Sequence, residues 1–230
     1  MPKNIHENHR DRLRERFRKE GLGHFEPHQV LELLLFYAIP RRDVNPVAHE
    51  LLLRFGSLRA VLDTPYEHLR TVPGMTENAA LFLTLLPQLA RSYAIGGEPE
   101  HPFLLEPDIL RSYLMARYVG VRVELPLLLC LDSAGKLKDM HEFPAGTFSA
   151  VGLDLRVLAE QIIRKNASAV ILAHNHPGGK ALPSPEDIET TRRAAWLFKE
   201  IRVRLCDHVI CAGSELFSMA ADKRLMGLFI

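Results

Sequence analysis

The stretch AVILAHNHPGGKALPSPED, which spans residues 169–187, decides how the second half of the chain folds. Its apolar start, Ala169–Ala173, predicts a short buried strand, and the glycines that follow predict a turn. Ser184 and Pro185 then predict a helix, with the serine as N-cap and the proline in the first helical position. A strand, a loop and a helix in succession are typical of a sheet that is covered by helices.

Two histidines stand where the predicted strand ends. Residues at positions i and i+2 of an extended chain share one face, so His174 and His176 point to one side and Asn175 to the other. The N-cap at Ser184 puts Asp187 in the first helical turn, from which its carboxylate can face the strand end. Two imidazoles and one carboxylate leave the fourth position of a tetrahedral metal open, as in catalytic zinc sites. The sequence therefore predicts that His174, His176 and Asp187 bind Zn²⁺.

Each part of this pattern also has a purely structural interpretation. Ser184 and Asp187 have the spacing of an ordinary capping pair, in which each side chain binds a free N–H at the helix start. A single surface histidine carries no functional information. The conjunction of the H-x-H pair, the glycine turn and the S-x-x-D helix start within one segment is what favours a metal site.

Glu124 is the second unusual feature. It opens the apolar run 121–132, and a carboxylate at the start of a buried strand is costly unless it has a partner. Three competing carboxylates, Glu106, Glu142 and Glu160, do not open a core strand.

The remaining patterns predict an α/β (α+β) chain with a helical domain at 1–95, a linker at 96–107 and a mixed-sheet domain at 108–230. In the first half, helices are expected at 8–20, 28–37 and 45–54, and LRTVPGMTENAAL (69–81) predicts two helices joined by a tight turn. In the second half, strands are expected at 121–132, 137–143, 169–173, 203–211 and 216–219, and helices at 109–118, 153–165 and 185–200.

The segment 8–20 alternates arginine and glutamate, which predicts a solvated helix with internal ion pairs. The alternative is a basic arm that contacts nucleic acid.

The composition is that of an ordinary soluble globular protein, with 47% hydrophobic and 25% charged residues. A formal net charge of +1 argues against polyanion binding by the chain as a whole. The three cysteines have no metal-binding spacing and fit a reducing compartment. Because no signal peptide and no bilayer-spanning apolar run is visible, we expect a cytoplasmic protein without a membrane partner.

The metal segment resembles a known signature. His174-x-His176 followed by Ser184-x-x-Asp187 is similar to the JAMM (MPN+) metalloprotease motif, and HNHPGG…PSPED with DHVI at Asp207–Ile210 resembles its RadC-like branch. In the first half, LELLLFYAIPRRDVNPVAHELLLRFGSL and LRTVPGM are similar to the RadC N-terminal domain. Two departures, Gly178 in place of the usual serine and the absence of Pro-Arg-Glu-Val at 153–157, remove no ligand.

The resemblance implies an all-helical N-terminal domain followed by a JAMM/MPN domain, with DNA repair as the setting that the RadC name suggests. It gives Glu124 the role of general acid–base, which accepts a proton from the attacking water and delivers it to the leaving amine. It also implies that Ser184 stabilises the oxyanion. Asn175, Asp207 and His208 are expected to orient ligands, although a packed core histidine explains His208 equally well.

The segment 69–81 resembles the helix–hairpin–helix module, which binds a DNA phosphate through backbone N–H groups. This implies a phosphate contact at Pro73, Gly74 and Met75. However, Met75-Thr76 replaces the usual apolar–glycine pair, and a purely structural hairpin is an equal alternative.

Three functions follow from these patterns. The first is a zinc hydrolase that cleaves a peptide or isopeptide bond in a peptide or protein substrate. The second is a metal-dependent DNA-processing enzyme such as a nuclease. The third is a DNA-associated binding protein with a structural metal site, which Glu124 disfavours because a structural site has no need of it.

Overall fold

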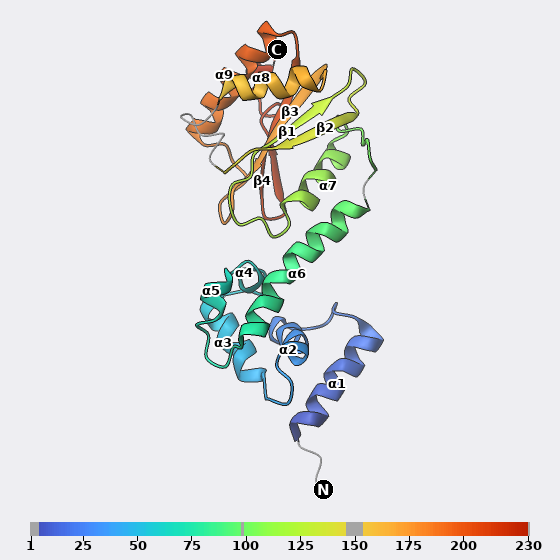
Figure 1. Cartoon of the computed structure of the whole chain (residues 1–230), viewed down its shortest axis with the longest axis vertical. Coiled ribbons are helices and arrows are strands. Elements are labelled where there is room, and N and C mark those ends of the chain that lie inside the picture. The colour runs from blue at the N-terminus through green and yellow to red at the C-terminus, as the bar shows by residue number, and fades with distance from the viewer. Residues whose placement is uncertain (1–4, 98, 146–153, 230) are drawn as a thin grey trace. The chain divides into compact units, whose positions relative to one another are not determined.

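The computed structural model describes residues 5–97, 99–145 and 154–229 (Figure 1). The chain divides into two compact units, Met1–Ala90 and Arg91–Ile230. The division falls inside helix α6 (Glu77–Gly96), whereas the predicted first domain ends at residue 95. The helix continues through Gly96, so its last residue lies one position beyond the end of the predicted first domain.

The first unit contains only helices among its described residues, as predicted. They are α1 (Ile5–Glu20), α2 (Pro27–Ala38), α3 (Asn45–Phe55), α4 (Leu58–Leu62), α5 (Tyr66–Leu69) and most of α6. Helix α4 was not expected from the pattern; its N-cap is Ser57, whose side chain accepts a hydrogen bond from the N–H of Ala60. The apolar helix faces meet in one core, which includes the fully buried Leu31, Leu35 and Leu51.

The second unit is built on a mixed sheet, which confirms the predicted fold class. The described strands are β1 (Leu127–Leu131), β2 (Leu137–Glu142), β3 (Ala169–Asn175), β4 (Arg204–Ala212) and β5 (Glu215–Ser218), in the order β2-β1-β3-β4-β5. Strands β3 and β4 are parallel and are joined through helix α9 (Pro185–Glu200), and all other neighbours are antiparallel.

Side chains alternate between the two faces of this sheet. Leu129 and Ile171 pack in one core with helix α7 (Pro107–Tyr118), while Leu128 and Leu172 pack in another with α8 (Leu155–Arg164) and α9. Figure 1 shows α7 on one face of the sheet and α8 and α9 on the opposite face. The even-numbered residues of β3 therefore face α9, which directs His174 toward the start of that helix.

One predicted strand boundary is wrong. The apolar run 121–132 forms a strand only from Leu127, since Pro126 has no N–H to donate to a ladder. The end of the predicted linker 96–107 packs into the second unit, where Leu104 is fully buried and Phe103 forms a β-bridge with Lys136.

The other elements of the second unit follow the prediction closely. Helix α8 lies within the predicted 153–165, of which Leu153 is outside the described residues. A 3-10 helix (Met226–Phe229) that was not predicted follows the last strand. Over the described ranges, none of the helices has the length and apolarity needed to cross a membrane.

Candidate metal centre

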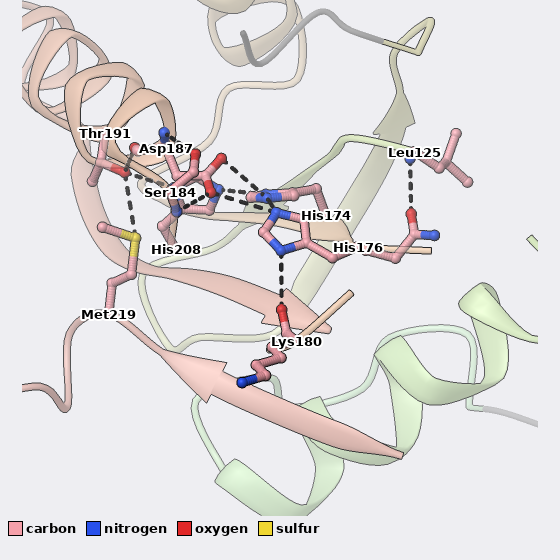
Figure 2. Close-up of polar contacts among 10 residues, drawn as sticks. Leu125, His174, His176, Lys180, Ser184, Asp187, Thr191, His208 and Met219 are labelled. Atoms are coloured by element: carbon pink, nitrogen blue, oxygen red, sulfur yellow. Dashed lines mark hydrogen bonds and ion pairs between the residues drawn. The ribbon is translucent and has the colours of Figure 1, made fainter. Parts of the chain in front are cut away.

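The three predicted metal ligands come together at one end of β3. His174 is the second-to-last residue of β3, and His176 directly follows the strand. The backbone N–H of His176 donates a hydrogen bond to the backbone oxygen of Cys211 at 2.7 Å. Asp187 lies in the first turn of α9. Figure 2 shows both imidazole rings beside the Asp187 carboxylate. In the part of the chain that the structure describes, these three residues form a group whose ligand atoms all lie within 4.8 Å of one another.

The nitrogens that face the centre are the Nε2 atoms. Nε2 of His174 lies 2.9 Å from Nε2 of His176 and 3.1 Å from Oδ1 of Asp187. The other ring nitrogen of His176, Nδ1, lies 3.1 Å from the backbone oxygen of Lys180. Because a carbonyl only accepts hydrogen bonds, Nδ1 of His176 carries the proton and Nε2 presents its lone pair to the centre.

A positive charge between His174, His176 and Asp187 would stabilise this arrangement. The lone pair of His176 and the carboxylate of Asp187 both face Nε2 of His174, which is fully buried. Electron pairs held this close in a buried place repel one another with little screening by water. A proton on Nε2 of His174, or a metal ion between the three groups, removes that repulsion. Two imidazoles and one carboxylate are a donor set that suits a divalent transition metal.

The Asp187 carboxylate is also held by the helix start. Its Oδ2 accepts a hydrogen bond from the backbone N–H of Ser184 at 2.7 Å, and Oγ of Ser184 accepts one from the N–H of Asp187 at 3.1 Å. This is the capping pair expected from the sequence. Burial by itself raises the pKa of Asp187, but the hydrogen bonds with His174 and Ser184 outweigh it and hold the pKa below its ordinary value. The carboxylate is therefore ionised at neutral pH.

Asn175, between the two histidines, points to the opposite face and binds the backbone on both sides of Glu124. Its Oδ1 accepts a hydrogen bond from the N–H of Leu125 at 2.8 Å, which Figure 2 shows, and its Nδ2 donates to the backbone oxygen of Val123 at 3.0 Å. The side-chain amide thus clamps the segment that carries Glu124 to the end of β3.

The ladder between β1 and β3 ends before it reaches Glu124. In the antiparallel β1–β3 pair, Leu127 lies opposite Ala173. This pair is the last of the ladder at this end, and beyond it the side chain of Asn175 holds Leu125 and Val123. Glu124 itself is half-buried and lies in the irregular segment before β1, and it is not a member of the three-ligand group.

The two predicted residues of β4 have different surroundings. His208 is fully buried, and its Nε2 lies 3.0 Å from Nδ1 of His174. Burial lowers the pKa of His208 well below its ordinary value, so the ring is neutral. The Asp207 carboxylate instead accepts hydrogen bonds from Oγ of Ser218 at 2.5 Å and from the N–H of Ala220 at 2.9 Å. His208 therefore adjoins a ligand, whereas Asp207 holds the chain that leaves β5.

Similarity to known proteins covers most of the chain. Residues 104–225 match the model of the RadC-like JAB domain. The chain belongs to the RadC-like JAB domain family. A UPF0758 protein of Fusobacterium nucleatum is 33% identical over 230 residues, which cover 96% of this chain and 99% of the relative. UPF0758 proteins of Bordetella bronchiseptica (36% identical; 92% and 94% covered) and Ruegeria pomeroyi (35% identical; 98% and 100% covered) are similar in the same way.

Membership of the RadC-like family confirms the resemblance stated from the motifs. The glycine that replaces serine in the metal loop, Gly178, has a φ of +69° with open space where a Cβ would stand. Glycine adopts this left-handed conformation without strain. The departure from the RadC-like pattern therefore suits the turn that follows His176.

The turn between α5 and α6 in this RadC-like chain is closely packed. Gly74 has a φ of +83°, and a Cβ there would lie 2.8 Å from Cγ2 of Val47. The N–H of Met75 donates to the backbone oxygen of Val72 at 3.0 Å. Packing thus explains the glycine without a ligand, and a phosphate contact by Pro73, Gly74 and Met75 stays a prediction.

Two groups at the centre were not predicted. Lys180 contributes only its main-chain carbonyl, for which no side-chain pattern exists. Oγ of Thr191 lies 2.6 Å from Nδ1 of His208, and Thr191 stands four residues after Asp187 on α9. Residues at this spacing share a helix face, which is the one signal in the sequence that could have identified Thr191.

Proposed function

We propose that this protein is a zinc-dependent hydrolase of the JAMM type that cleaves a peptide or isopeptide bond. The observation that carries the proposal is the convergence of two Nε2 atoms and one carboxylate at one end of β3. The side chain of Asn175 binds the backbone on both sides of Glu124 and so ties the segment that carries this glutamate to the same end of the strand. A bound zinc would act as a Lewis acid and make a water molecule nucleophilic at neutral pH.

The ligand set supports zinc as the metal. Bonds of 2.0–2.2 Å place the ligand atoms of a tetrahedral zinc site roughly 3.3–3.6 Å apart. Nε2 of His174 lies 2.9 Å from Nε2 of His176 and 3.1 Å from Oδ1 of Asp187, so a small outward shift of the rings would admit the ion. Three protein ligands leave one position for water or substrate, as in catalytic zinc sites.

The protein's own groups would carry the proton and hold the substrate. Glu124 accepts a proton from the attacking water and returns it to the leaving nitrogen, as a general acid–base. The Oγ of Ser184 already accepts a hydrogen bond from the N–H of Asp187, so its own proton is available to donate to the developing oxyanion.

Glu124→Gln tests the proposal. The zinc-loaded wild type is incubated with a peptide and isopeptide library, and metal content is measured alongside turnover. We expect the variant to keep one equivalent of zinc and to lose turnover by at least about 100-fold, since general acid–base catalysis contributes 10²–10⁴-fold. Glu160→Gln, an exposed position on α8, is the matched control and should behave as the wild type. Normal turnover by Glu124→Gln would refute the assigned role.

The alternative function is a DNA-processing activity. It requires that the protein bind DNA, which we expect of the N-terminal unit. In helix α1, the basic side chains of Arg18 and Lys19 are paired with Glu15, and Arg16 with Glu20, which favours the solvated helix over a basic arm. Nicked, single-stranded and duplex DNA in the same assay decide between the activities. Phosphate contacts predict DNA binding by the full chain that weakens steeply with salt; binding unaffected by salt would count against them.

A further inference from the structure

A hydrogen-bonded chain runs from α9 through β4 to the ligand His174 (Figure 2). Oγ of Thr191 lies 2.6 Å from Nδ1 of His208, and Nε2 of His208 lies 3.0 Å from Nδ1 of His174. All three residues are fully buried. The chain also returns to the centre, because Oγ of Thr191 lies 2.6 Å from the backbone oxygen of Asp187. A chain of hydrogen bonds therefore joins two of the proposed metal ligands.

The direction of each hydrogen bond follows from the Thr191 hydroxyl. A carbonyl only accepts, so the single hydroxyl proton of Thr191 is donated to Asp187. The sulfur of Met219, 3.6 Å from the same oxygen, is a weaker acceptor. With its proton used in this way, Thr191 accepts a hydrogen bond from His208. The proton of His208 therefore sits on Nδ1.

A charged ring would be costly in this fully buried place, so His208 is uncharged. With its proton on Nδ1, its bare Nε2 accepts the Nδ1 proton of His174. In the zinc-loaded protein, Nε2 of His174 is then the nitrogen without a proton, and it faces the centre. We propose that Thr191 and His208 are positioning residues that hold His174 in its Nδ1–H tautomer and thereby make Nε2 its metal-binding atom. This proposal rests on the metal site of the proposed function and is independent of which bond is cleaved.

The nature of the acceptor has a chemical consequence. Histidine ligands usually donate their second N–H to a carboxylate, a carbonyl or water. Here the acceptor is an uncharged imidazole, which returns less negative charge to the ligand than a carboxylate would. We therefore expect the metal to polarise a group bound at its open coordination position more strongly than it would with a carboxylate acceptor.

The first test is a competition titration of the full chain with Zn²⁺ and a chromophoric chelator. Thr191→Val keeps nearly the same volume but offers His208 no acceptor, so the Nδ1 proton loses its partner. We expect zinc affinity to fall by about 10–100-fold, the usual cost of losing a group that orients a metal ligand. Thr191→Ser keeps the hydroxyl and should retain most of the wild-type affinity.

Thr64→Val is the matched control. Thr64 is also buried and also donates its hydroxyl proton to the carbonyl four residues earlier, Ala60, at 2.7 Å, but it lies in the N-terminal unit. This variant should bind zinc as the wild type does. Wild-type affinity in Thr191→Val, or equal losses in Thr191→Val and Thr191→Ser, would overturn the proposal.

A second measurement does not depend on the folding of any variant. Imidazole ¹⁵N spectra of the zinc-loaded wild type distinguish the two neutral tautomers, and both His174 and His208 should be protonated on Nδ1. A proton on Nε2 of His208 would overturn the proposal. Neither measurement records hydrolysis, so the absence of hydrolase activity would leave both results unchanged, and the two proposals can fail separately.

Discussion

The two oxygens of the Asp187 carboxylate face different partners. Oδ1 lies 3.1 Å from Nε2 of His174, whereas Oδ2 accepts a hydrogen bond from the N–H of Ser184 and lies 3.5 Å from Nε2 of His176. From the sequence alone, the S-x-x-D spacing fits a helix cap and a metal ligand equally well. The geometry shows that one residue can serve in both ways, since Oδ1 faces His174 while Oδ2 accepts the capping hydrogen bond.

Asp187→Asn should separate the two roles. The asparagine oxygen can still accept the hydrogen bond from Ser184, so we expect the metal-free variant to unfold within about 1 kcal/mol of the wild type. A neutral amide is a poor ligand, and zinc affinity should fall by more than about 100-fold, exceeding the loss of an orienting group. Ser184→Ala should do the reverse, with about 1 kcal/mol of lost stability and retained zinc. Equal behaviour of the two variants in calorimetric unfolding and zinc titration would contradict the separation.

Asn175 offers a second test at the residue scale. Its amide is the group that holds the N–H of Leu125, beside Glu124. In Asn175→Ala we expect the Leu125 amide hydrogen to exchange at least about 10-fold faster, because protection in an irregular segment depends on such single bonds. Asn175→Asp keeps the acceptor for Leu125 and should preserve most of the protection. Unchanged exchange in Asn175→Ala, measured by NMR, would show that Asn175 does not position the Glu124 segment.

At the scale of elements, local signals decided which parts were predictable. The β3–loop–α9 unit was predicted because an apolar run, a glycine turn and a serine–proline helix start each act within a few residues. The start of β1 was not predicted. The apolar run continues on both sides of Pro126, and its sequence does not show that pairing with β3 begins only at Leu127. There the side chain of Asn175, from another element, takes the place of the ladder.

The residues of the candidate centre also divide into those that a local pattern predicted and those that it did not. His174, His176 and Asp187 were predicted because they fall in one short segment with a recognisable spacing. The contact of His208 with His174, and that of Thr191 with His208, join three different elements, so no pattern within one segment predicts these two contacts.

The turn before α6 gives a prediction that separates backbone strain from crowding. Gly56 and Gly74 have φ values of +87° and +83°, but only at Gly74 would a Cβ meet another side chain, Val47. Gly56→Ala should cost about 1 kcal/mol of stability from strain alone. Gly74→Ala should cost about 1–3 kcal/mol more, which is typical of overpacking. Equal midpoints in urea unfolding would show that the close contact with Val47 does not explain the glycine.

At the scale of the molecule, each unit has its own apolar core, and the second unit has one on each face of its sheet. All three cysteines belong to the second unit. Cys211 lies in the core next to α7, and Cys130 lies in the core next to α8 and α9. The reactivity of the Cys211 thiol therefore measures how open the core next to α7 is, and that of the Cys130 thiol measures the core next to α8 and α9.

Thiol reactivity should show that both cores are closed. Burial raises the pKa of Cys130 to about 11 and that of Cys211 to about 12, so neither forms a thiolate at pH 8. Burial also raises the pKa of the partly exposed Cys206. With an aromatic disulfide reagent at pH 8, we expect at most slow labelling of Cys206 in the native chain and labelling of all three thiols in denaturant. Rapid native labelling of Cys130 or Cys211, mapped by mass spectrometry, would mean that the corresponding core opens.

The central claim is that His174, His176 and Asp187 form one metal site through the Nε2 atoms and the carboxylate. Anomalous diffraction at the zinc edge, from crystals of the zinc-loaded protein, tests it most directly. The expected result is one strong peak at about 2.0–2.2 Å from Nε2 of both histidines and from an oxygen of Asp187. A peak at other residues, ligation through Nδ1, or no peak here at full zinc loading would contradict it.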